Sequence, residues 1–160
     1  MKGILDARQL AAYISNEYKE KFDKEISPVR LQKTLYFCFA YWGGFVRKGK
    51  QENSEIEVKN LSEYLFSNKI EAWVYGPVIP DVYFENNIEK YYNSKLFDDK
   101  LMIKEIIDNV IEDTYDFNDF RLVDISHKDK AWINKFNYDE QYHNNEIEKE
   151  KIIDEYARKQ

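Results

Sequence analysis

The sequence LQKTLYFCFAYWGGF, residues 31–45, carries apolar side chains at most of its positions. Ser27 and Pro28 stand shortly before it. This pair is typical of a helix start, because serine caps the first turn and proline lacks only an N–H that has no partner there. A helix that is apolar on most sides is usually buried among other elements. We therefore predict a central hydrophobic helix that begins at Pro28, and Gly43 and Gly44 allow another segment to approach it closely.

The rest of the chain alternates between periodic and polar stretches. Turn-forming residues at 66–69 and alternating side chains at 70–75 predict a short β-hairpin whose strand ends at Gly76 and Pro77. Residues 47–60 are polar without a sustained period, which predicts a surface connection. Apolar spacing and capping residues predict further helices at 7–23, 80–92, 103–111, 118–127, 129–136 and 145–158. The expected fold is mainly α (α+β), in one compact helical domain over residues 1–160.

The composition is that of a globular, acidic protein. Hydrophobic residues make up 43% of the chain and the formal net charge is −6, so nothing draws the whole molecule toward the phosphates of nucleic acid. The segment 98–119 holds eight acidic residues against two lysines. Its acidic face, with Asp108, Glu112 and Asp116, is interpreted either as a solvated helix face or as a surface for a basic partner.

Residues suited to catalysis or metal binding are sparse. Cys38, the single cysteine, falls in the apolar stripe of the central helix, where a packing thiol is expected instead of a nucleophile. His127 and His143 are separated by a distance in sequence that matches no common zinc-ligand spacing. The glycines do not form a phosphate-binding loop. We therefore predict that the protein is not an enzyme and holds no metal and no cofactor.

Two further observations concern location. No stretch of the sequence is long and apolar enough to cross a membrane, and one cysteine gives no sign of an oxidising compartment. We expect a cytoplasmic protein.

Residues 71–83, EAWVYGPVIPDVY, concentrate rigid and aromatic side chains. The two prolines fix their φ angles, which lowers the entropy cost of holding the segment in one shape. Trp73, Tyr75 and Tyr83 are expected to form an aromatic cluster with polar groups at its edge. Such a turn either packs the hairpin against the central helix or serves as a preorganised docking surface, and the two roles are compatible.

Three motifs resemble those of the Panacea domain family, also described as SocA-like or GepA-like and phage-associated. They are a helix motif at 31–36, the Glu-Ala-Trp-x-x-Gly-Pro-Val-x-Pro-x-Val-Tyr motif at 71–83, and a His-x-x-x-x-Trp segment within 122–132. Thr34 and Lys130 depart from the residues usual at their positions. The resemblance assigns a structural or partner-binding role to the matching residues: Leu31, Gln32, Lys33, Tyr36, Glu71, Trp73, Tyr75, Gly76, Pro77, Val78, Pro80, Tyr83, His127 and Trp132.

The resemblance implies a small, mainly helical antitoxin of a bacterial two-gene toxin-antitoxin operon, often carried by a prophage. Such a protein neutralises its toxin by direct binding, so its partner is another protein, and neither a membrane nor a small molecule is involved. A motif shared by proteins with different partners should maintain the scaffold. We therefore expect partner choice to depend on residues 47–68, the acidic helix face and the C-terminal helix.

Three alternatives stay open on the sequence. An adaptor or phage counter-defence protein would block a host factor through the acidic surface. An enzyme would use His127 as an acid or base. An autorepressor would bind its own promoter, against the unfavourable net charge.

Overall fold

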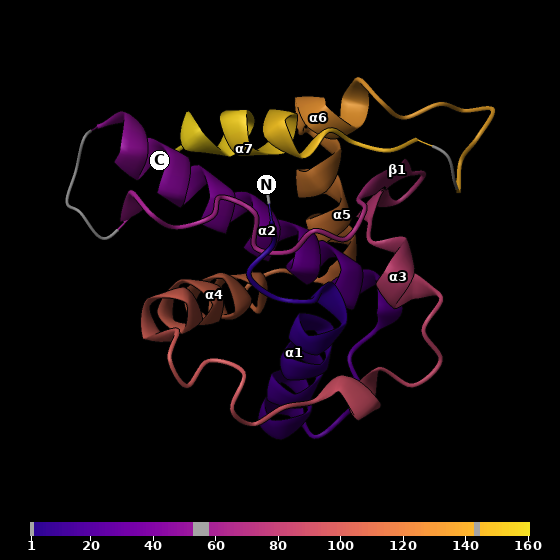
Figure 1. Cartoon of the computed structure of the whole chain (residues 1–160). Helices are drawn as coiled ribbons and strands as arrows, with labels where there is room; N and C mark the ends of the chain where they lie inside the picture. The colour runs from indigo at the N-terminus through magenta and orange to yellow at the C-terminus, as the bar shows by residue number, and fades with distance from the viewer. Residues whose placement is uncertain (1, 53–57, 143–144) are drawn as a thin grey trace.

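Helices make up most of the molecule and surround one long helix, α2 (Figure 1). The computed structural model describes residues 2–52, 58–142 and 145–160. In chain order the elements are α1 (Ala7–Phe22), α2 (Pro28–Gln51), β1 (Glu71–Trp73), β2 (Gly76–Val78), α3 (Pro80–Tyr83), the 3-10 helix η2 (Ile88–Tyr91), α4 (Leu101–Thr114), α5 (Asp119–His127), α6 (Lys130–Ile133) and α7 (Lys149–Ala157). The prediction of a mainly α fold with a short hairpin is confirmed.

The predicted start of the central helix is confirmed by its cap. Ser27 has an extended backbone, and its Oγ accepts a hydrogen bond from Arg30 N at 3.1 Å, while Pro28 occupies the first turn. The side chains of Leu35, Cys38 and Trp42 are fully buried. Figure 1 shows α2 passing between α7 on one side and α1 and α4 on the other. The most apolar helix of the chain is therefore the one that the other helices cover.

The central helix is longer than the sequence indicated. A surface connection was predicted from residue 47 onward, but α2 continues to Gln51. The guanidinium group of Arg47 explains this extension, because it donates hydrogen bonds to Glu63 and Glu150 and to Asp154 of α7. These long-range ion pairs hold the last turns of α2 in place. The rest of the predicted connection includes residues 53–57, which lie outside the described residues.

The close approach predicted at the paired glycines is present, and α7 makes it. A Cβ atom on Gly43 would lie 2.6 Å from Cγ1 of Ile153, and one on Gly44 would lie 2.7 Å from the backbone carbon of Tyr156. Ile153 and Tyr156 are buried at this contact. The absence of two side chains on α2 therefore lets a second helix pack directly against its backbone.

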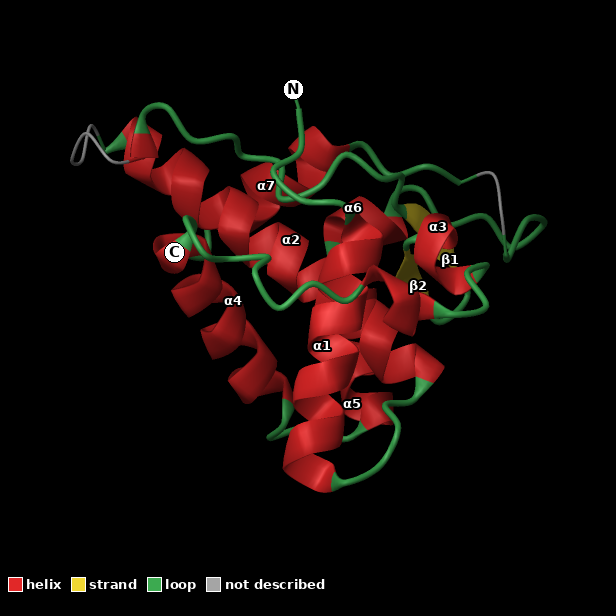
Figure 2. Ribbon diagram, turned by 60° about the horizontal axis from the view of Figure 1, so that its bottom comes forward, coloured by secondary structure: helices red, strands yellow, loops and turns green. Residues whose placement is uncertain are grey.

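The predicted position of the hairpin was wrong. β1 and β2 pair antiparallel with Trp73 opposite Gly76, so Val74 and Tyr75 form the turn and Gly76 begins a strand instead of ending one. The φ angle of Gly76 is +107°, a conformation that side-chain-bearing residues rarely adopt, and it allows this tight reversal. Figure 2 shows the two strands at one edge of the helical body.

The free edge of β1 pairs with a segment from the C-terminal part of the chain. Ala72 N donates to Asn145 O and Ile147 N donates to Ile70 O, both at 2.8 Å. The residues predicted as a hairpin turn, 66–69, lie instead beside the N-terminus, where Phe66 forms a parallel bridge with Leu5. These contacts join distant parts of the sequence, so no local pattern indicates them.

The remaining helices differ from the predictions mainly in length. The helix predicted over 80–92 was wrong, because only α3 and η2 form there. α4 begins and ends slightly beyond the predicted 103–111, while α5, α6 and α7 lie within the predicted ranges. In the described part of the chain no helix is both long and apolar enough to cross a membrane.

Candidate protein-binding site

Two polar side chains of α2 fix the second strand and the start of α3. Gln32 forms a pair of hydrogen bonds with the backbone of Ile79: its Oε1 accepts from Ile79 N at 2.8 Å and its Nε2 donates to Ile79 O at 3.3 Å. Lys33 Nζ donates to Pro77 O at 2.9 Å. Both side chains are buried, so these bonds replace water at backbone groups that would otherwise have no partner.

Gly76 is the point at which β2, α2 and α5 meet. A Cβ atom at this position would lie 2.5 Å from Ser126 Oγ on α5 and 2.8 Å from Lys33 Cε on α2. A side chain at position 76 would have no room, and the positive φ angle would also be unfavourable for it. The glycine of the motif is therefore required by packing as well as by the turn.

Lys33 places an ionisable amine in the interior of the protein. Burial lowers the pKa of its amine to about 7, because the charged form loses its hydration in the interior. Among the described residues, its hydrogen-bond acceptor is the carbonyl oxygen of Pro77. Both the charged and the uncharged amine can donate to that carbonyl.

His127 and Trp132 hold the other side of the hairpin. His127 Nε2 lies 3.0 Å from Val74 O, and because a carbonyl oxygen only accepts, Nε2 carries the proton. Trp132 Nε1 donates to Trp73 O at 2.8 Å. The two rings stack with centroids 4.1 Å apart. Burial lowers the pKa of His127, so the ring is neutral at pH 7 and acts as a structural link to the turn.

Asp129, which the sequence analysis did not single out, joins the same region to α7. Its Oδ2 accepts hydrogen bonds from Tyr36 Oη and Tyr156 Oη, both at 2.5 Å, and its Oδ1 pairs with Lys159 Nζ at 3.2 Å. Burial, followed by the charge of Tyr156 and Asp129, raises the pKa of Tyr36. One buried carboxylate thus connects α2, α6 and α7. In the sequence, the only feature that pointed to Asp129 was its position at the start of a predicted helix.

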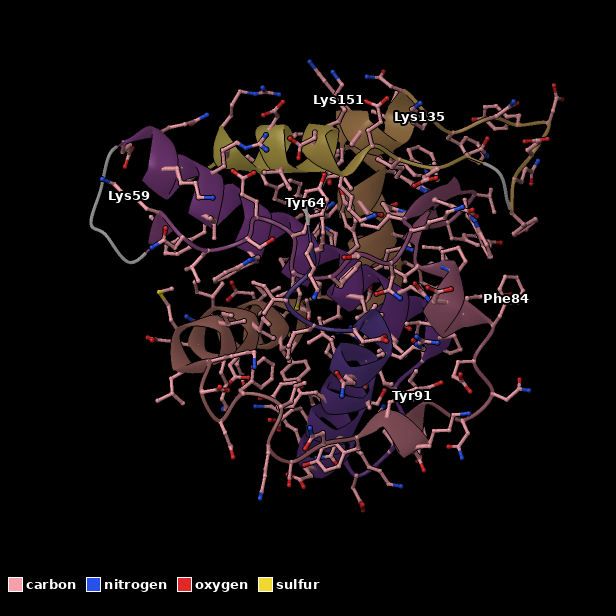
Figure 3. The ribbon with its side chains drawn as sticks, in the orientation of Figure 1. Lys59, Tyr64, Phe84, Tyr91, Lys135 and Lys151 are labelled. Carbon is pink, nitrogen blue, oxygen red and sulfur yellow. The ribbon has the colours of Figure 1, made fainter. Side chains whose placement is uncertain are left out.

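Outside this network lies a group of rings that we call the aromatic corner, formed by Trp73, Tyr83, Phe84 and Tyr142. Trp73 is 4% exposed, and its ring centroid lies 4.8 Å from Tyr83 and 6.1 Å from both Phe84 and Tyr142. The three outer rings are 53%, 69% and 53% exposed. Figure 3 shows Phe84 at the edge of the molecule, pointing into solvent.

The aromatic corner differs in membership from the predicted cluster. Trp73 and Tyr83 make contact as expected, but Tyr75 lies in the turn, is 58% exposed and stacks on no other ring among the described residues. Phe84 and Tyr142 were not identified. Phe84 directly follows the motif and was an available signal, whereas Tyr142 is brought in by the segment that pairs with β1.

The other motif residues support the same region. Trp73 Nε1 donates to Glu71 Oε1 at 2.9 Å. Leu31 packs against the core, Val78 is buried, and Pro80 begins α3. The structure therefore brings most of the motif residues together around the hairpin, where their contacts fix the backbone.

The predicted acidic face is not one surface. Asp108 accepts hydrogen bonds from Tyr13 Oη at 2.5 Å and Lys104 Nζ at 2.7 Å, and Glu112 pairs with Lys21 at 3.6 Å. These two residues face α1. Asp116 lies elsewhere, in a hollow that it lines with residues of α2 and α5. A partner that contacts Asp116 would therefore meet the surface between α2, α4 and α5.

The residues considered for catalysis or metal binding lie in surroundings that suit a structural role. Cys38 is buried, and burial raises the pKa of its thiol, which disfavours the reactive thiolate. His143 lies outside the described residues. Within the ranges that the structure describes, no group of His, Cys, Asp and Glu side chains is arranged to hold a metal ion.

Comparison with known proteins gives one match. The family model described as "Antitoxin SocA-like, Panacea domain" matches residues 54–133. This range includes the motif at 71–83 and the segment that contains His127 and Trp132, whereas the helix motif at 31–36 precedes it. Neither the curated proteins nor the solved structures yield a significant match to the chain.

Proposed function

The chain belongs to the antitoxin SocA-like, Panacea domain family, and from this premise we propose that it neutralises a cognate toxin by binding it directly. In this proposal both proteins are encoded by a bacterial toxin-antitoxin operon of phage or prophage origin and meet in the cytoplasm. The antitoxin makes or breaks no covalent bond and uses no metal or cofactor. The alternative is an adaptor or counter-defence protein that blocks a host factor.

The observation that carries the proposal is the aromatic corner. Exposed aromatic rings that surround a buried one provide large contact areas at a low entropy cost, as in the hot spots of protein interfaces. The backbone beneath Trp73 is held by Trp132 and His127, and that beneath Tyr83 by Gln32 through Ile79. Little conformational freedom is then lost when a partner binds, which favours affinity.

The surroundings of the reactive side chains support binding instead of catalysis. Cys38 packs in the core, and the Nε2 proton of His127 is committed to Val74 O. Lys33 is buried and bonded to Pro77 O. Each of these groups has a role in holding the scaffold on which the aromatic corner stands.

The test is co-expression with the adjacent open reading frame. If that frame encodes a toxin, its induction should stop growth unless this protein is present. The double variant Phe84→Ala, Tyr142→Ala should lose most of this protection while its melting temperature stays close to that of the native protein, because both side chains are largely exposed.

A matched control is Phe120→Ala, which removes a ring that is 82% exposed on α5. This variant should protect as well as the native protein. Full protection by the double variant would assign toxin binding to another surface. If the adjacent frame is harmless, or if the two purified proteins form no complex, the proposed function is wrong.

A further inference from the structure

A groove lies between α2, α4 and α5, away from the aromatic corner, and shares no residue with it. Its volume is about 500 Å³. The walls are mostly aromatic and aliphatic, and the lining residues that carry the argument are Phe37, Tyr41 and Phe45 from α2, Ile106 and Val110 from α4, and Ile125 from α5.

Three aromatic rings of α2 line the groove. Phe37, Tyr41 and Phe45 are spaced by four residues, which places them on one face of α2 over about 12 Å. The ring of Tyr41 is fixed by an edge contact with Tyr156, with centroids 4.9 Å apart. Tyr41 and Phe45 are nevertheless 40% and 36% exposed. Phe37 is 5% exposed, so the part of this face that remains in contact with solvent is formed by Tyr41 and Phe45.

The charge at the groove has one sign. Among its lining residues the only charged side chains are Asp113 and Asp116, and no basic residue lines it. Both carboxylates are exposed, and neither forms an ion pair or a side-chain hydrogen bond with another described residue. They differ in this respect from Asp108 and Glu112, which have partners within the chain. The net charge of −6 acts in the same direction.

We propose that this groove binds an amphipathic helix of a protein partner, with apolar side chains on one face and lysine or arginine beside them. Apolar anchors at positions i and i+4 of such a helix are about 6 Å apart along its axis, which matches the spacing of the exposed Tyr41 and Phe45. The basic side chains would pair with Asp113 and Asp116, whose charges are not neutralised within the chain. The proposal rests on the proposed function, since it gives the partner a second contact.

The first experiment selects peptide ligands and does not require the partner itself. A messenger-RNA display library of helix-favouring peptides is selected against the immobilised full-length chain, and the binding of enriched peptides to the protein is measured by fluorescence anisotropy. The expected result is enrichment of apolar residues with helical spacing, flanked by lysine or arginine. Enrichment of acidic or uncharged peptides, or of none, would overturn the proposal.

The second experiment locates the binding site of the selected peptides. The variant Asp113→Lys, Asp116→Lys should bind them about tenfold more weakly or worse, because two attractions become repulsions. The control Glu89→Lys, Asp98→Lys makes the same change in net charge at exposed positions outside the groove. It should bind within about twofold of the native protein.

Three results would contradict the assignment. Equal weakening by both charge-reversal variants would mean that net charge, and not the groove, attracts the peptides. Undiminished binding by the groove variant would mean that they bind elsewhere. Sedimentation that detects a dimer of the native protein, but not of a Phe45→Glu variant, would assign the groove to a second copy of this chain.

The proposed function is tested separately by protection from the toxin. If the groove variant protects fully while the Phe84→Ala, Tyr142→Ala variant does not, the inference fails and the proposed function remains. If peptides bind the groove as expected but no toxin is neutralised, the proposed function fails alone.

Discussion

The buried amine of Lys33 illustrates how a single side chain serves the scaffold at a cost in stability. A lysine in the interior is unfavourable in its charged form, yet its bond to Pro77 O holds the strand that contains Gly76. Lys33 forms no ion pair with a carboxylate of the described residues. The motif lysine therefore orients the hairpin, and its burial predicts a stability that depends on pH.

Replacing Lys33 with methionine should remove a pH dependence of stability. The amine pKa is about 7 in the folded protein, against a reference value of 10.5, so the unfolded chain binds more protons between these values. The free energy of unfolding should therefore rise with pH across this window by up to about 1.4 kcal/mol per pH unit, and this contribution should be flat below the lower value. Urea unfolding of the native protein and Lys33→Met at several pH values measures the difference.

The exposed Lys95 provides the control for this experiment. Lys95→Met should keep the slope of the native protein, since its amine is hydrated in both states. If the stability of the native protein does not rise with pH relative to that of Lys33→Met, the Lys33 amine is not desolvated as the structure indicates.

The contact between α2 and α7 shows how two helices depend on each other. α7 is short, and helices of this length are marginal without packing. It is held by Ile153 and Tyr156 against the glycines of α2, and by Arg47 through Asp154. The hydroxyl group of Tyr156 also binds Asp129. Detachment of α7 would thus expose the core and remove support from α6.

Gly44→Ala should destabilise the protein by about 2 kcal/mol, as overpacked sites commonly do. Helix propensity alone predicts the opposite sign, because alanine favours a helix over glycine by about 1 kcal/mol. The added Cβ would lie 2.7 Å from backbone atoms of Tyr156, which move only if α7 moves. Thermal unfolding gives the change in stability, and hydrogen exchange should increase first in residues 149–157.

The control is Lys48→Ala on the same helix, which removes one exposed ion pair with Glu52. Its effect should be below about 0.5 kcal/mol. A stabilised Gly44→Ala variant would show that α7 is not packed against this glycine.

At the scale of the whole molecule, the proposed binding gives charge and shape different roles. The net charge of −6 would act at a distance, whereas the aromatic corner and the groove would act only on contact. Long-range attraction mainly changes the association rate, and well-packed contacts mainly change the dissociation rate. The two contributions can be separated by varying the salt concentration, because salt screens the long-range attraction.

Association with a basic toxin should therefore slow by about tenfold or more between about 50 mM and 500 mM salt, because the Debye length shortens. Phe84→Ala should raise the dissociation rate and leave this salt dependence unchanged. Stopped-flow or surface-plasmon-resonance measurements with the cognate toxin distinguish the two rates. An association rate that does not change with salt would show that electrostatic steering does not contribute to binding.

Local chemistry made part of this structure predictable. The cap at Ser27, the apolar spacing of α2 and α4, and the paired glycines each act over a few residues. α2 starts where expected, and α4 includes the whole predicted range. The motif at 71–83 identified the region around which the candidate site is built. The predicted α3 was too long because a proline at a first turn indicates where a helix begins but not where it ends.

The sequence by itself determined the helical class, the buried central helix, the rigid turn and the acidic charge, because these follow from side chains close together along the chain. Only the tertiary structure decided the position of the hairpin turn, the acceptor of Lys33 and the role of Asp129. The bonds from Lys33 to Pro77 and from Tyr36 to Asp129 join residues 44 and 93 positions apart. Such partners are set by how whole elements pack, and no local preference encodes them.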